Sequence, residues 1–209
     1  MRKAESGARA GWEQGFRHGG KTEQRHSRGR SLERFNDRKL GWLHDSIHFI
    51  VLSVLLVVLF RFVIGVAAVG GESMFPTLEN GDLVVYLRIV PNFRPGDIIS
   101  MRVPAGDYYI KRVTAVGGDI VDLHDGQITV NGEPEYAPGA VGPTEEESGA
   151  VIYPYRVRRD NVFVLGDNRG VSMDSRAFGE VSRRQIKGRI ILRIGRSGVE
   201  VPGRKESAA

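Results

Sequence analysis

Residues 47–69 form a long apolar run whose only charged side chain at neutral pH is Arg61. As a helix, these 23 residues would be roughly 34 Å long, enough to cross a bilayer core of roughly 30 Å. Arg61 leaves two possibilities open. Its side chain reaches the far interface, or the span ends near it and residues 62–69 form an apolar edge of the next domain. The run predicts one transmembrane signal anchor over residues 45–68.

The excess positive charge lies before this run. Residues 1–44 carry 11 Lys+Arg against 5 Asp+Glu, whereas the rest of the chain carries 19 against 20. This distribution, rather than the overall pI of about 9.7, argues against a nucleic-acid partner. The segment is poor in apolar residues, so we expect a disordered tail that stays cytoplasmic, with the C-terminal part outside. A cleaved export signal is the alternative, but its apolar region would be shorter.

After the apolar run, the sequence changes to short Val/Ile/Tyr-rich segments separated by Gly, Pro, Asp and Asn, a pattern typical of strands. We expect a mainly β protein, in which a single N-terminal transmembrane helix precedes an extracytoplasmic antiparallel β catalytic domain over residues 69–196. Residues 133–155 would form a loop or small insertion, and residues 197–209 a flexible C-terminal tail. The chain has no cysteine, so no disulfide can stabilise this domain. The expected strands are residues 82–87, 97–103, 108–116, 120–123, 128–130, 162–165 and 186–194.

Two residues in this region suggest hydrolytic chemistry. Ser73 directly follows the apolar run, and Lys111 lies 38 residues later within an expected strand. A serine hydroxyl needs a base to remove its proton, and lysine can be that base only where burial keeps its amine neutral. An isolated strand lysine would ordinarily face water. A Ser-His-Asp triad would have to use His124, which lies in an expected turn.

A third segment, residues 166–179, is dense in Gly, Asp, Asn, Ser and Arg and follows an expected strand. Taken alone, it could be an ordinary turn-rich loop. The alternative is a loop that serves the Ser/Lys pair. In that case Ser172 accepts a hydrogen bond from Lys111, while Asp174 and Arg176 pair to brace the loop.

Four sequence blocks, in this order behind an anchor, resemble bacterial type I signal peptidase, the leader peptidase that removes export signals. They are Ser73-Met-Phe-Pro-Thr-Leu, then Gly81-Asp-Leu-Val with Pro95-Gly-Asp-Ile, then Tyr109-Ile-Lys-Arg-Val with Gly117-Gly-Asp, and Gly166-Asp-Asn-Arg with Ser172-Met-Asp-Ser-Arg. The resemblance covers about residues 47–195.

This resemblance implies a membrane-bound serine endopeptidase that cleaves signal peptides after a small-x-small motif. Ser73 would be the nucleophile and Lys111 the general base, assisted by Ser172. We expect no cofactor and no metal, with signal peptides of exported preproteins and the lipid bilayer as partners of a monomeric enzyme. The residues expected to contact substrate are Val69, Met74, Tyr109 and Ile110, near Ala67.

One position departs from the family pattern. Many relatives carry an oxyanion-stabilising hydroxyl two residues before the nucleophile, where this chain has Gly71. We therefore expect Gly71→Ser to raise kcat, provided that Gly71 does not need a positive φ.

Two other functions fit parts of the sequence. A self-cleaving Ser/Lys repressor-type peptidase shares the Ser/Lys pair, but it needs a DNA-binding module, and the basic tail has no helix-turn-helix pattern. The second alternative is a catalytically silent, membrane-anchored β module that only binds exported chains.

Overall fold

The computed structural model describes residues 42, 44–103, 106–147 and 151–202. The chain divides into two compact units, residues 1–54 and 55–209. The expectation of a disordered basic tail over residues 1–44 falls almost entirely outside the described residues.

An apolar helix runs from His44 to Val63 and is long and apolar enough to cross a membrane. Its last turn, η1 (Leu59–Val63), is π-helical. The helix ends near Arg61, as the second of the two possibilities held, and the predicted end at residue 68 is wrong, because Ile64–Ala68 form strand β1. This strand pairs along its whole length with β2 (Leu83–Leu87). Gly65 lies so close to the Tyr86 ring that a Cβ would come within 2.2 Å of it, so only glycine fits there. Strand pairing thus overrides the helical continuation that apolarity alone suggested.

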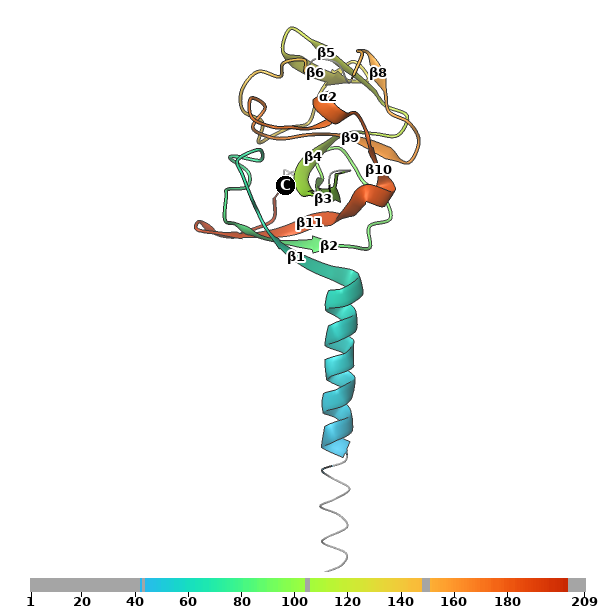
Figure 1. Ribbon diagram of the computed structural model, residues 1–209, viewed down its shortest axis with the longest axis vertical. Helices are drawn as coiled ribbons and strands as arrows, with labels where there is room; N and C mark the ends of the chain where they lie inside the picture. Colours follow the sequence, from blue (N-terminus) through green and yellow to red (C-terminus); the bar gives the residue numbers. More distant parts are fainter. Residues whose placement is uncertain (1–41, 43, 104–105, 148–150, 203–209) are drawn as a thin grey trace, which may run out of the picture. The chain divides into compact units, whose positions relative to one another are not determined.

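The larger sheet is antiparallel, with strand order β1-β2-β11-β3-β4-β9-β10, and β12 pairs with β11. Figure 1 shows β9 on the side of α2 (Ser175–Phe178) and β2 on the opposite side. The expectation of a flexible tail from residue 197 is wrong for β12, whose three residues pair with the end of β11. The remaining strands are β3 (Ile98–Arg102), β4 (Tyr108–Val116), β9 (Asn161–Leu165), β10 (Val181–Ser182), β11 (Ile186–Gly195) and β12 (Gly198–Glu200).

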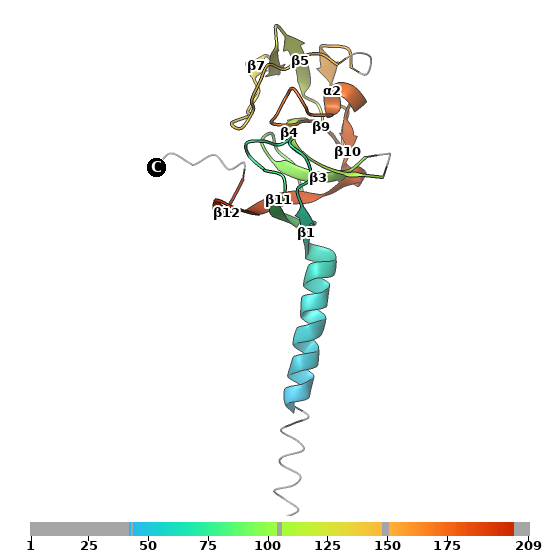
Figure 2. The same cartoon turned by 60° about the vertical axis from the view of Figure 1, so that its left-hand side comes forward.

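A smaller antiparallel sheet has the order β7-β6-β5-β8. Figure 2 shows its strands β5 and β7 at the top of the view, above β9 of the larger sheet. It consists of β5 (Ile120–His124), β6 (Gln127–Val130), β7 (Glu133–Pro134) and β8 (Tyr155–Arg156). The expected loop or insertion over residues 133–155 is mostly loop where it is described, and only its ends enter the sheet. All seven runs predicted as strands are confirmed, each with ends that agree within one residue.

Buried aliphatic side chains hold the larger sheet together on both faces. One cluster combines Ile98 of β3 with Met74 and Leu78 of the segment after Ser73. A second contains Ile99 and Val113, so β3 and β4 contribute to the core from both sides. Because successive strand residues point to opposite faces, this explains why both strands read as nearly continuous apolar runs.

Candidate active site

A cavity of about 420 Å³ gathers the expected nucleophile, base and substrate-contacting residues, whereas Ser172, Asp174 and Arg176 lie behind its lining. Its lining comes from β1, the Ser73 segment, β3, the start of β4 and the loop before α2. The predicted residues in this lining are Val69, Ser73, Met74, Tyr109, Ile110 and Lys111, together with Ala67.

Backbone hydrogen bonds fix the Ser73 segment at both of its ends. The Val69 N–H donates to the Asp82 carbonyl (2.8 Å), and the Gly81 N–H donates to the Val69 carbonyl (2.9 Å). The Ser73 carbonyl in turn accepts from the Asn168 N–H (3.1 Å). The nucleophile candidate is therefore joined directly to the loop that carries Ser172.

Lys111 lies in β4 and is 3% exposed. Its amine donates a hydrogen bond to the Ser172 hydroxyl at 3.0 Å, as the sequence predicted. It also lies 5.5 Å from the centroid of the Tyr109 ring, within cation–π range. The amine is thus held between one hydroxyl and one aromatic ring, with no carboxylate bonded to it in the described part of the chain.

Burial lowers the pKa of Lys111 to about 8. The charge of Asp174 acts in the opposite direction, and the charge of Arg176 reinforces the effect of burial. An ordinary lysine has a pKa of about 10.4 and is almost fully protonated near neutrality. A pKa of about 8 leaves a usable fraction of neutral amine, which is what a general base requires.

The predicted pair between Asp174 and Arg176 is confirmed and is bidentate, with both N···O distances at 2.9 Å. The Arg176 guanidinium also donates to the carbonyls of Arg169 and Ser172. Asp174 further accepts from the Gly166 N–H and caps α2. These contacts fix the backbone on both sides of Ser172, so its hydroxyl is held at the position that Lys111 contacts.

Gly166 allows Ser73 and Ser172 to approach each other. A Cβ at this position would come within 2.1 Å of the Ser172 hydroxyl and 2.5 Å of the Ser73 carbonyl. The glycine in the Gly166-Asp-Asn-Arg block is thus explained by close packing rather than by flexibility.

Sequence analysis missed a second buried cation beside the base. Arg112 makes a bidentate pair with Asp167 (2.7 and 2.6 Å) and also donates to the Gly96 carbonyl. Thr77, in the segment after Ser73, donates to the same carboxylate at 2.5 Å. This centre joins the three segments that carry Ser73, Lys111 and Ser172. A charged residue inside an apolar strand needs a buried partner, and that signal could have revealed it.

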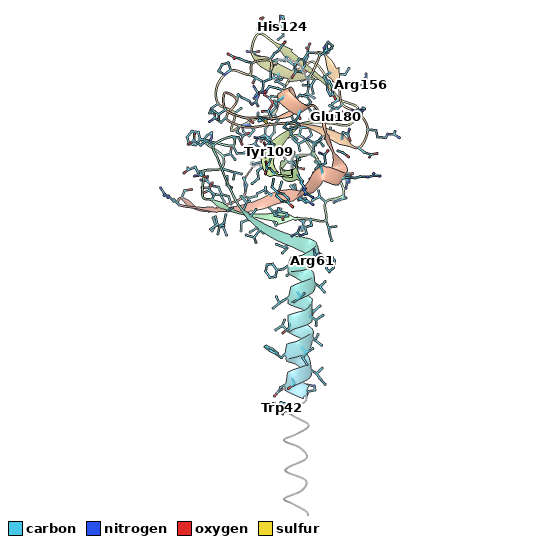
Figure 3. All side chains as sticks on the ribbon, viewed as in Figure 1. Trp42, Arg61, Tyr109, His124, Arg156 and Glu180 are labelled. Atoms are coloured by element: carbon cyan, nitrogen blue, oxygen red, sulfur yellow. The ribbon has the colours of Figure 1, made fainter. Side chains whose placement is uncertain are left out.

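His124 does not belong to this site. Its side chain is 87% exposed and pairs with the neighbouring Asp125. Figure 3 shows it at the outer end of the smaller sheet, away from Tyr109, which lines the cavity. The Ser-His-Asp alternative is therefore wrong.

The lysine amine bonds to Ser172 and not to Ser73 within the described residues. Catalytic hydrogen bonds are often completed only when substrate binds. Ser73 and Lys111 nevertheless lie close together, because both line the same cavity.

Comparison with known proteins identifies the family of this chain. The family model described as signal peptidase, peptidase S26, matches residues 42–194. The chain belongs to this family. A signal peptidase I from Leptolyngbya laminosa is 34% identical over 165 residues, which are 73% of this chain and 79% of the relative. Signal peptidase IB from Staphylococcus aureus is 32% identical over 172 residues, 74% of this chain and 88% of the relative.

A crystal structure of a signal peptidase I from Enterococcus faecalis is 26% identical to this chain. It aligns with 48% of this chain and 98% of the solved one, at a TM-score of 0.41. The family assignment rests on the match of the family model to residues 42–194 and on the two relatives. The resemblance predicted from the four sequence blocks is confirmed.

Proposed function

We propose that this chain is a membrane-bound serine endopeptidase that cleaves N-terminal signal peptides from exported preproteins after a small-x-small motif. The observation that carries the proposal is the buried Lys111, held by Ser172 in the same cavity as Ser73. Membership of the signal peptidase family supplies the substrate class.

In the proposed reaction, neutral Lys111 takes the proton of the Ser73 hydroxyl as its oxygen bonds to the scissile carbonyl carbon. The backbone N–H of Ser73 stabilises the oxyanion. The C–N bond then breaks, and the Lys111 ammonium gives its proton to the leaving amine. Water next attacks the ester while Lys111 takes its proton, and that proton returns to the Ser73 oxygen as the ester bond breaks.

The edge of β4 supports an extended substrate. Residues 108–111 pair with β3 on one side, whereas β9 joins the other side of β4 only from Arg112 onward. Among residues 108–111, the backbone N–H and C=O groups that point away from β3 are therefore available to pair with a peptide strand, as in β-strand addition. The segment that remains free is the one that lines the cavity.

The lining also supports a preference for small substrate side chains. The cavity of about 420 Å³ lies at the lower end of the range for ligand sites and has to hold several residues of peptide. Large side chains from three segments already occupy its walls, namely Met74, Tyr109, Ile110 and Met173. Met74 is almost completely buried, and close packing around it resists expansion of that wall.

Two features support a bilayer partner. One is the apolar helix His44–Val63. The other is a set of aliphatic side chains that cross-strand pairing places on one face of β1, β2, β11 and β12, here called the outer apolar face. Several of its members are exposed, and a contiguous exposed apolar patch marks an interaction surface. The outer apolar face comprises Ile64, Val66, Ala68, Leu83, Val85, Leu87, Leu192, Ile194 and Val199.

We place the basic N-terminal tail in the cytoplasm and the β unit outside, because positive charge is retained on the cytoplasmic side. Protease added to intact protoplasts should therefore digest the β unit and spare an epitope tag within residues 1–44. Protection of the β unit together with loss of the tag would reverse this orientation.

The decisive test is cleavage of a reporter preprotein by the detergent-solubilised full chain. Wild type should release the mature product, and Ser73→Ala should not. Ser197→Ala, at an exposed turn, is the matched control and should retain full activity. Binding without cleavage by wild type would favour the silent β module. Cleavage of the chain itself, with the reporter left intact, would favour the self-cleaving peptidase.

A further inference from the structure

The cavity lining includes a buried serine that the proposed reaction does not use. Ser100 of β3 is 3% exposed and lines the cavity beside the β4 edge. Lys111 bonds to Ser172, and the Tyr109 hydroxyl lies 3.8 Å from the Met173 sulfur. The Ser100 hydroxyl, by contrast, has no hydrogen-bond partner among the residues that the structure describes.

Strand pairing explains why Ser100 has no side-chain hydrogen-bond partner in the part of the chain that the structure describes. Directly opposite residues on paired strands point to the same face. On one side Ser100 faces Ile110 of β4, and on the other it faces Gly188 of β11. Neither residue has a polar side-chain atom. A side chain at Gly188 is excluded, because its Cβ would come within 2.3 Å of the Leu87 carbonyl.

The surroundings of Ser100 are aliphatic. Ile98, two residues earlier on the same face, belongs to the buried cluster that contains Met74 and Ile190, and Ile110 packs against that cluster. The hydroxyl is open to the cavity, since the fully buried side-chain polar atoms without a partner among the described residues are Glu135 Oε2 and the Tyr153 hydroxyl oxygen. A substrate that fills the cavity displaces water from the Ser100 hydroxyl, and the hydroxyl then needs a hydrogen bond from the substrate itself.

We infer that Ser100 is a specificity-determining residue that makes the cavity favour a small hydroxylated substrate side chain, such as serine, at one of the two small positions before the cut. This inference rests on the proposed function. A purely aliphatic pocket would favour alanine, because it would leave a serine hydroxyl unpaired. A pocket with its own hydroxyl can donate to and accept from that group, which offsets the loss of water.

The test measures selectivity within a mixture. Two reporter peptides that differ only in Ser or Ala, first at the position before the cut and then two residues earlier, compete for the same enzyme. The ratio of their kcat/KM values does not depend on how much enzyme is folded. Relative to wild type, Ser100→Ala and Ser100→Val should lower the Ser/Ala ratio by about 2- to 12-fold at one position. Ser100→Thr, which keeps the hydroxyl, should restore it.

A second measurement needs no variant. Wild type is given two reporter peptides that differ at that one position. One has serine, and the other has 2-aminobutyrate, in which a methyl group replaces the hydroxyl. Wild type should prefer serine, because a site built to bond a hydroxyl discriminates against the analogue that lacks it.

The outcomes separate this inference from the proposed function. No cleavage of any reporter by wild type would refute the proposed function itself. Cleavage with an unchanged Ser/Ala ratio in Ser100→Ala and Ser100→Val would overturn the role of Ser100. Equal losses for both peptides in those variants would do the same, because they would mean that Ser100 contacts the substrate backbone.

Discussion

The two faces of β4 each carry a buried cation, and the two cations have opposite surroundings. Arg112 meets the Asp167 carboxylate in a bidentate pair, with further contacts to Thr77 and Gly96. Lys111, its neighbour on the other face, has just two such partners among the described residues, the Ser172 hydroxyl and the Tyr109 ring. Both side chains are almost fully buried. Burial is therefore common to both cations, and what distinguishes them is the group that each one contacts.

The difference in partners fits two different roles: Lys111 as the proposed base, and Arg112 as a brace that links chain segments. A guanidinium stays protonated at any usable pH, and with a matched carboxylate it can link three chain segments. A lysine with no bonded carboxylate has its pKa lowered to about 8 by burial, so it can accept a proton. Substitutions on the two faces should therefore differ in kind: those at Lys111 remove chemistry, and those at Arg112 remove stability.

The largest expected effect is at the base. Lys111→Ala and Lys111→Arg should each reduce kcat/KM for reporter cleavage by roughly 10⁴-fold or more, because neither side chain can serve as the base. Lys187→Arg, the matched exchange outside the cavity lining, should leave cleavage close to wild type. Appreciable activity in Lys111→Arg would remove Lys111 from the mechanism.

The next effect concerns Arg112 and the stability of the fold. Arg112→Ala leaves Asp167 buried without its cation and should lower the free energy of unfolding by about 3–5 kcal/mol. Urea titration of the detergent-solubilised chain, followed by circular dichroism, measures this. Arg189→Ala is the control, because its partly exposed pair with Asp97 should contribute about 0–1 kcal/mol. Similar small losses in both variants would show that Arg112 is not the brace.

Sequence predicted the strands well, because their Val/Ile-rich runs are short and separated by strong turn residues. Lys111, Ser172 and the Asp174–Arg176 pair were also predictable, because unusual polar residues in known blocks indicate chemistry. For Ile64–Ala68 the sequence left two possibilities open, since a short apolar run fits a helix or a strand equally and only pairing with β2 decides between them. Arg112 and Ser100 were missed because their significance lies in what faces them across the sheet, which a linear pattern does not contain.

The lowered pKa of Lys111 also predicts a pH-dependent cost to folding. With a pKa of about 8 when folded and 10.5 as the reference value, the difference of 2.5 corresponds to at most about 3 kcal/mol. The charged form is disfavoured in the fold, so the cost is complete below pH 8 and disappears as pH rises to about 10.5.

Lys111→Met removes this titration. Between pH 7 and pH 10.5, the free energy of unfolding of wild type should rise by up to about 3 kcal/mol relative to that of the variant, because Lys111 loses its charge in the unfolded state as well. Unfolding curves at several pH values measure the change. In wild type, kcat/KM should rise with pH and inflect near 8. A stability difference independent of pH would mean that Lys111 is not desolvated as proposed.

Ser172 should have a smaller effect. Ser172→Ala removes the acceptor that holds the Lys111 amine, a hydrogen bond to a charged group worth about 1.5–3 kcal/mol. We expect kcat to fall by about 10- to 100-fold while the fold remains intact. The inflection of the kcat/KM profile should move to lower pH, since the lost bond stabilised the charged form. A fall in kcat without that movement would assign Ser172 a role other than orienting the lysine.

The smallest effect concerns Gly71, where the structure changes the expectation drawn from sequence. Gly71 has φ of +87°, and its N–H donates to the Asn80 side chain at 3.1 Å. The condition attached to a gain from Gly71→Ser is therefore not met. A Cβ there would meet no atom within 4 Å, so the cost is conformational rather than steric and should be about 1–2 kcal/mol for any other residue.

Gly71→Ser and Gly71→Ala should thus lose stability or kcat to the same extent, with no gain for serine. Gly70 provides the matched control, because a Cβ there also meets nothing within 4 Å and no positive φ is required. Gly70→Ala should cost less than Gly71→Ala. A higher kcat in Gly71→Ser alone would instead show that the segment can rearrange and that the oxyanion lacked a hydroxyl donor. Equal losses would assign to Gly71 the backbone turn that places Ser73 beside the base.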